Sequence, residues 1–164
     1  QDVIEHLTEK YGMPEAQIRV NQKNIRDRAA AVGFDFHPEG RKHVYNTFNA
    51  HRLLHWAGVK GPAGSQHALK RALLESYQGR AEAVESDDVL LAVVASVGLD
   101  VAEAKNILAS DTYAEEVREI ERFYQQAGIH SVPAVIINDK HLISGGQPAA
   151  VFEQALRRIA AGEV

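Results

Sequence analysis

The chain has 164 residues, an apolar content of 45% and a net charge of −4, as expected for one globular domain or one domain with a large insertion. Its basic residues are scattered, so we do not expect nucleic acid as a partner. The longest apolar run, residues 89–99, is broken by Ser96 and Gly98 and is too short to span a membrane. The chain has no cysteine, which excludes disulfides, thiolate metal sites and a cysteine nucleophile within these residues.

The amino-terminal region is predicted to begin with two helices. Asp2 can cap a short first helix, which Gly12 would end. Pro14 is at a favoured first position of a second helix, which would end before Gly33. One face of that helix would carry the apolar side chains of Ile18, Ile25, Ala29 and Val32.

Two further helices are predicted after an irregular segment at residues 34–46. Thr47 is the expected N-cap of a helix that stops near Gly58. After a glycine- and proline-containing loop that ends at Gly64, another helix should run towards Gly79.

The next three helices also begin at polar capping residues. Ser86 or Asp87 would cap a helix at residues 89–97, which is apolar nearly all round and is therefore predicted to be the buried centre of the helical group. Asp100 is the expected N-cap of the next helix, and Asp111 that of the helix after it, which carries many charged residues.

The carboxy-terminal region has a different pattern. The β-branched run at residues 134–137 predicts a strand, residues 142–143 a second one, and Pro148 the start of a final helix. The first run does not alternate with polar residues, which is typical of a strand covered on both faces. Because an isolated hairpin is at best marginally stable, we expect further strands, most simply from a segment upstream of Gln1.

Four motifs in this order suggest a family. They are NTFNAHRLL at residues 46–54, LASDTY at 108–113, GIHSVPAVII at 128–137 and SGGQP at 144–148. Together they resemble the DsbA family of thiol–disulfide oxidoreductases, in its FrnE-like subgroup, over nearly the whole chain. The resemblance implies an α/β, thioredoxin-like fold with a large all-helical insertion. Residues 1–128 would form the insertion, and residues 129–164 the C-terminal half of the thioredoxin-like domain.

The sequence departs from the family pattern because it contains no CxxC motif. Thiol–disulfide exchange needs an attacking thiolate, so these residues cannot perform the reaction alone and no catalytic residue is assigned within them. The resemblance places the CxxC segment upstream of Gln1. It also implies a protein disulfide oxidoreductase or isomerase without a cofactor, in the cytoplasm, acting on protein or small-molecule thiols and disulfides. No nucleic acid or membrane is expected as a partner, and a homodimer is left open.

The predicted substrate-binding loop comprises Ser131, Val132 and Pro133. Proline lacks an amide hydrogen, so a Val-Pro turn leaves a neighbouring backbone edge exposed. The resemblance implies that Pro133 is cis and that the loop faces the cysteines. The Val132 backbone could then hold a substrate peptide as an added strand.

Three other polar residues are candidates for the cleft: Asn46, His51 and His130. His130 adjoins the loop and could tune a thiolate by its charge, or it could be an ordinary solvated histidine. His51 and His55 are one helical turn apart, but no third ligand is evident, so no metal is predicted.

Two alternative functions are open at this point. The first is a glutathione-dependent transferase or 2-hydroxychromene-2-carboxylate isomerase-like enzyme, which shares the architecture. The run at residues 145–147 counts against it, because it lacks the hydroxyl and carboxylate of that group's glutathione-binding turn. The second is a non-catalytic module that binds peptides or partners, which the lack of cysteine favours.

Overall fold

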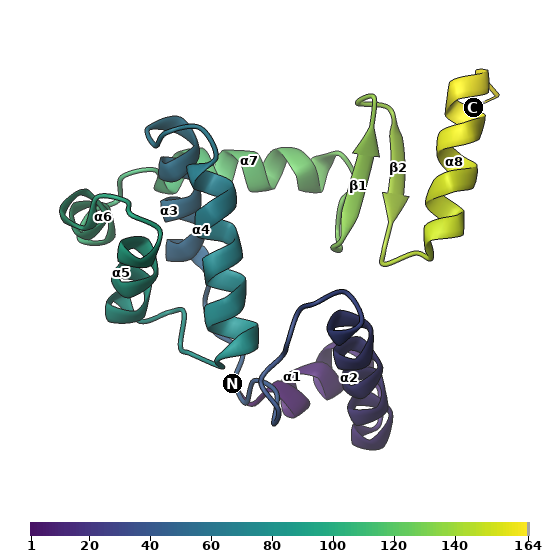
Figure 1. Ribbon diagram of the computed structural model, residues 1–164, viewed down its shortest axis with the longest axis horizontal. Coiled ribbons are helices and arrows are strands. Elements are labelled where there is room, and N and C mark those ends of the chain that lie inside the picture. The colour runs from purple at the N-terminus through teal and green to yellow at the C-terminus, as the bar shows by residue number, and fades with distance from the viewer. Residues whose placement is uncertain (164) are drawn as a thin grey trace. The chain divides into compact units, whose positions relative to one another are not determined.

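The structure is a computed structural model that describes residues 1–163, in which helices predominate (Figure 1). The chain forms two compact units, Gln1–Val117 and the residues from Arg118 onward. This division lies inside a helix, whereas the sequence analysis placed the boundary at residue 128. No helix among residues 1–163 is long and apolar enough to cross a membrane.

The first two helices are α1 (Val3–Tyr11) and α2 (Glu15–Ala30). The predicted ends of α1 are confirmed: the Asp2 carboxylate accepts the N–H groups of Ile4 and Glu5, and Gly12 is left-handed with φ +63°. In α2 the predicted apolar face is buried only at Ile18, which is 2% exposed. Ile25 is 55% exposed, and Val32 lies past the end of the helix at 83% exposure.

The core lies among four helices of the first unit: α3 (Phe48–Val59), α4 (Ser65–Leu74), α5 (Asp87–Ser96) and α6 (Val101–Leu108). Leu53, Leu69, Leu90 and Val94 are fully buried there. The prediction that residues 89–97 supply the centre of the helical group is confirmed by Leu90, Val93 and Val94 of α5. Asp100 caps α6 as predicted, accepting the N–H groups of Ala102 and Glu103.

A π-helix, η1 (Glu75–Gly79), continues α4, where the sequence predicted a single helix to Gly79. The N–H of Arg80 donates to the Glu75 carbonyl over 2.9 Å. The wider turn buries Ser76 and Tyr77 and places the Tyr77 hydroxyl 3.1 Å from the His43 carbonyl, to which it donates. Segments of this kind are rare and occur mostly as single turns, frequently at functional sites.

Arg52 of α3 is the one charged side chain in the buried part of this unit, at 4% exposure. Its guanidinium donates to the carbonyls of Ile107, Ser110 and Thr112. Ile107 is in the last turn of α6, and the other two residues come shortly after the helix ends. It also donates to the Asn49 side chain over 3.0 Å. Carbonyls at and beyond the carboxyl end of a helix lack intrahelical donors, and the guanidinium supplies donors to those of Ser110 and Thr112. The Ile107 carbonyl also accepts the Ser110 N–H over 3.2 Å.

The chain ends with α7 (Ala114–Gln126), β1 (Ala134–Ile137), β2 (His141–Ser144) and α8 (Ala149–Ala161) (Figure 1). The two strands pair antiparallel, with Ala134 opposite Ser144 and Ile137 opposite His141. Asn138 and Asp139 have φ of +54° and +55° in the turn between them. Positive φ at both central residues is the signature of a tight hairpin turn. The predicted strand–turn–strand–helix order is confirmed.

Candidate functional site

The loop at residues 131–133 leads directly into β1. The peptide bond between Val132 and Pro133 is cis. The Pro133 carbonyl accepts the N–H of Gly145 over 2.8 Å, which extends the hairpin ladder one step beyond the Ala134–Ser144 pair. This bond fixes the end of the loop to the residue that follows β2.

Val132 is the most exposed large apolar side chain among the described residues, at 87%. Within residues 1–163 neither its N–H nor its carbonyl has a hydrogen-bond partner. A backbone segment with a free donor and acceptor next to a strand can pair with another chain in the manner of a sheet edge. The loop therefore presents a single-residue docking edge beside an ordered hairpin.

The hairpin itself is incompletely covered. Its apolar residues Val135, Ile136 and Leu142 are 39%, 42% and 47% exposed. Among the described residues the sheet contains only these two strands. A two-stranded sheet with exposed apolar side chains has the character expected of part of a larger sheet.

Asn46, a predicted cleft residue, has a structural role. Its side-chain oxygen accepts the N–H of Phe48 over 2.9 Å at the start of α3. Thr47 is at the N-cap position, as predicted, but the side-chain hydrogen bond at this helix start comes from Asn46 instead. The reason is that an asparagine side chain reaches the N–H two positions later and closes an Asx turn. The Asn46 N–H donates in turn to the Glu85 carboxylate over 3.2 Å.

His51 borders a cavity of about 180 Å³ within the first unit. Opposite it the cavity is lined by Lys70, Leu73, Leu74 and Tyr77, from α4 and η1. Sequence reasoning missed Lys70 and Tyr77, although the spacing of these four residues marks one face of a helix. The ring of His55 instead contacts that of Tyr113, with 5.3 Å between centroids. Residues 1–163 contain no group of three or more side chains placed to bind a metal ion.

His130 and Ser131 both lie exposed just before Val132, in the second unit. Within residues 1–163 neither side chain has a hydrogen-bond partner. The predicted site residues thus fall into two groups. Residues 130–133 are together in the second unit, and Asn46 and His51 are together around the start of α3 in the first.

Comparison with known proteins decides the family. The model of the DSBA-like thioredoxin domain matches residues 5–157. The chain belongs to this family. The structure is also similar to the crystal structure of a probable DsbA oxidoreductase from Streptomyces coelicolor, with a TM-score of 0.86 and 37% sequence identity. The match covers 100% of this chain and 69% of that one. A search of curated proteins gives no match.

The fold class predicted from the sequence is therefore confirmed: this DSBA-like chain is thioredoxin-like α/β, with a large helical part before its strand–strand–helix end. The family and the similar structure support a thiol–disulfide oxidoreductase type of function.

Proposed function

We propose that this DSBA-like chain takes part in thiol–disulfide exchange, with the 131–133 loop holding a substrate peptide beside a cysteine pair on a segment N-terminal to Gln1. The observation that carries the proposal is Val132, whose backbone N–H and carbonyl are both free within residues 1–163. A peptide that bound there would add as a short strand, through main-chain hydrogen bonds that do not depend on its sequence.

The cysteine pair belongs to the proposal because the chemistry requires it. In exchange, a thiolate attacks one sulfur of a disulfide, a new S–S bond forms, and the old one breaks to release the second sulfur as a thiolate. The 164 residues contain no sulfur nucleophile. The exposed apolar residues of β1 and β2 also support the proposal, because the segment that carries the cysteine pair could supply the strands that cover them. The similar Streptomyces chain is also longer than this one.

The test uses the product of the complete gene and two substitutions of Val132. Val132→Pro removes the free N–H, whereas Val132→Ala keeps it and trims only an exposed side chain. A single backbone hydrogen bond contributes about 0.5–1.5 kcal/mol, so oxidation of a reduced substrate protein should slow about three- to tenfold in Val132→Pro. Val132→Ala should stay within about twofold of the wild type.

Two results would count against the proposal. One is a complete gene product that shows no titratable thiol after reduction and denaturation. The other is equal activity of Val132→Pro and Val132→Ala in a product that does contain the cysteine pair. Circular dichroism of each variant checks that the fold is retained.

The finer assignments belong to the same proposal and are supported by the sequence motifs alone. They are membership of the FrnE-like subgroup, a cytoplasmic location, and isomerase activity alongside oxidation. Cell fractionation and a scrambled-disulfide substrate test the last two directly.

A second candidate function is a non-catalytic module that binds extended peptides through the same loop. The total lack of cysteine in these residues favours it. If the complete product has no thiol but binds an unstructured peptide more weakly as Val132→Pro than as Val132→Ala, this function replaces the first.

The glutathione-dependent alternative has weaker support. The Gln147 side chain donates to the Ser144 carbonyl over 3.0 Å, so its amide N–H is used within the turn. Calorimetric titration of the complete product with glutathione tests it, and tight binding would favour this alternative over exchange.

A further inference from the structure

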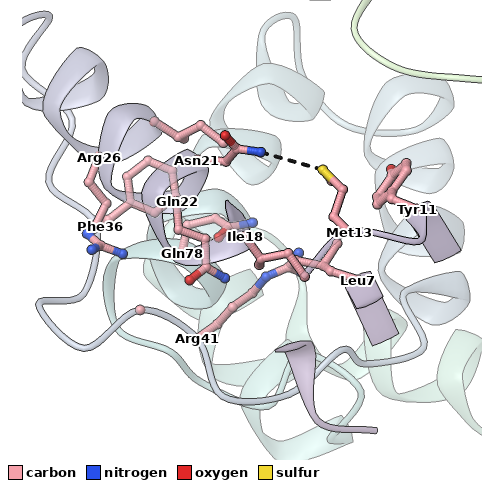
Figure 2. A pocket seen from close by; sticks show the side chains of 12 residues that line it. Leu7, Tyr11, Met13, Ile18, Asn21, Gln22, Arg26, Phe36, Arg41 and Gln78 are labelled. Atoms are coloured by element: carbon pink, nitrogen blue, oxygen red, sulfur yellow. Dashed lines mark hydrogen bonds between the residues drawn. The ribbon is translucent and has the colours of Figure 1, made fainter. Parts of the chain in front are cut away.

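The first unit contains a second cavity, of about 390 Å³, between α1, α2 and the segment at residues 36–41 (Figure 2). Small-molecule sites typically enclose about 300–1,000 Å³, so its size suits a compact organic ligand. Six of its lining side chains are apolar or aromatic: Leu7, Tyr11, Met13, Ile18, Ile25 and Phe36. All its lining residues belong to the first unit, whereas the 131–133 loop belongs to the second.

Figure 2 shows Arg26 with Phe36 on one side of the cavity, and Leu7, Met13 and Tyr11 on the opposite side. The Asn21 side-chain amide lies between them and donates to the Met13 sulfur over 3.8 Å. The Arg26 guanidinium therefore lies across the cavity from the apolar side chains of Leu7 and Met13.

Arg26 is half-buried and makes no hydrogen bond or ion pair within residues 1–163. Two other cations of the same helix are paired, Arg19 with Glu15 and Lys23 with Asp27, whereas Arg28 is exposed and outside the cavity. The side-chain amides of Gln22 and Gln78, also in the lining, have no partner among the described residues either. Donors left free inside a cavity are the groups that orient a ligand.

The charge of the lining is one-sided. It contains Arg26 and Arg41 but no aspartate or glutamate, although the chain as a whole carries a net charge of −4. The guanidinium of Arg41 is already engaged, since it donates to the Tyr77 hydroxyl and lies 4.8 Å from the centre of that ring. Arg26 is thus the free cation of the cavity, and Arg41 adds to the positive potential of the lining.

The wall that faces α2 is held in place by main-chain bonds. The N–H of His37 donates to the Gln78 carbonyl of η1 over 2.9 Å, and that of Gly40 donates to the His37 carbonyl over 2.7 Å. Gly40 has φ +70°, a conformation that favours glycine, and lets the segment turn close to Arg26. A wall fixed in this way needs little reordering when a ligand binds.

We propose that this cavity is a binding site for a small organic anion with an apolar body and a single carboxylate- or sulfonate-like head. The apolar body lies against the Leu7, Met13 and Ile18 side of the cavity. The head accepts charge-assisted hydrogen bonds from the Arg26 guanidinium. The side-chain amides of Gln22 and Gln78, in the same lining, are further donors that can orient the ligand. This inference does not depend on the thiol–disulfide function.

The test compares two probes on the product of the complete gene. 1-Anilinonaphthalene-8-sulfonate has an apolar body and one anionic head, and N-phenyl-1-naphthylamine is its neutral counterpart. Fluorescence titrations are made with the wild type, Arg26→Gln and Arg28→Gln. Arg28 lies outside this cavity on the same helix, so its substitution removes the same charge elsewhere.

The sulfonate should bind about tenfold more weakly to Arg26→Gln, because a hydrogen bond to a charged group is worth about 1.5–3 kcal/mol and the site is partly solvated. Arg28→Gln should stay within about twofold, and the neutral probe should bind all three proteins alike. Gln22→Glu, which adds a carboxylate to the lining, should also weaken sulfonate binding and leave the neutral probe unaffected.

The proposal is overturned if Arg26→Gln binds the sulfonate as the wild type does, or if Arg26→Gln and Arg28→Gln lose affinity equally. Amide shifts in ¹⁵N–¹H spectra locate the probe independently. They should cluster at residues 18–26 and 36–41, and a cluster confined to the hairpin would also refute the site.

Discussion

Replacing Arg52 with methionine should destabilise the first unit far more than any exposed charge does. The change keeps the apolar length of the side chain and removes the donors to three carbonyls at the end of α6. A buried carbonyl left without its partner costs about 1–3 kcal/mol. One of the three bonds is fully buried and two are partly buried, so we expect a loss of about 3 kcal/mol.

The loss can be measured by urea unfolding followed through Trp56. This is the single tryptophan of the chain, it is 2% exposed, and it lies in the same core as α6, so its fluorescence reports on the first unit alone. Arg52→Lys should recover part of the loss, because an ammonium group keeps the charge but lacks the planar fork that reaches several carbonyls at once.

Arg71→Met is the matched control, because Arg71 pairs only with Glu75 on the surface of α4 and η1. An exposed pair of this kind contributes about 0–1 kcal/mol. A loss below about 1 kcal/mol for Arg52→Met, with an unchanged denaturant slope, would refute the assigned role of Arg52. So would a stability of Arg52→Lys equal to that of the wild type.

Three more predictions concern the same unit and use the same unfolding assay. Asp100→Ala removes the cap of α6 and should cost about 1 kcal/mol, and an unchanged midpoint would contradict the capping bonds. Leu90→Ala should cost about 2–5 kcal/mol because Leu90 is fully buried, and the half-exposed Leu74→Ala should cost clearly less. Hydrogen bonds from Arg80 and Ser76 hold the pKa of Glu82 below its usual value of 4.5. The ionised group therefore stabilises the fold above that pH, and the contribution is lost as the pH falls through the lowered pKa. Glu82→Gln should accordingly lose stability at neutral pH and show a shallower acid dependence, and parallel pH profiles of the two proteins would contradict this.

The features that could be predicted from the sequence are those set by a few neighbouring residues. Asp2, Gly12 and Asp100 act within one helical turn, so their capping roles follow from residue type and spacing. The hairpin was also predictable, because a β-branched run followed by Asn138 and Asp139 is a local signal.

The features that could not be predicted depend on partners far along the chain. Ile25 has the spacing of a buried residue, yet it borders the cavity between α1 and α2 and stays half exposed. The π-turn of η1 preserves the apolar spacing of a helix, so periodicity does not reveal it. Arg52 has its three carbonyl acceptors more than fifty positions away, and nothing near it in the sequence marks it as buried.

The candidate site was predictable only in part, and for the same reason. Residues 131–133 could be named because a family resemblance adds information that composition and periodicity lack. That the Val132 N–H and carbonyl have no hydrogen-bond partner within residues 1–163, however, depends on where the rest of the fold lies, so only the structure shows it.

The half-covered hairpin has a consequence for how the chain behaves in concentrated solution. A short strand with free edges and exposed valine, isoleucine and leucine side chains is a template for pairing between molecules. A charge placed on it, for example by Ile136→Lys, would block such pairing and improve solubility. It would also spoil the surface from which a longer sheet is built. The apolar side chains of the four-residue strand β1 therefore favour completion of the sheet but lower the solubility of the chain.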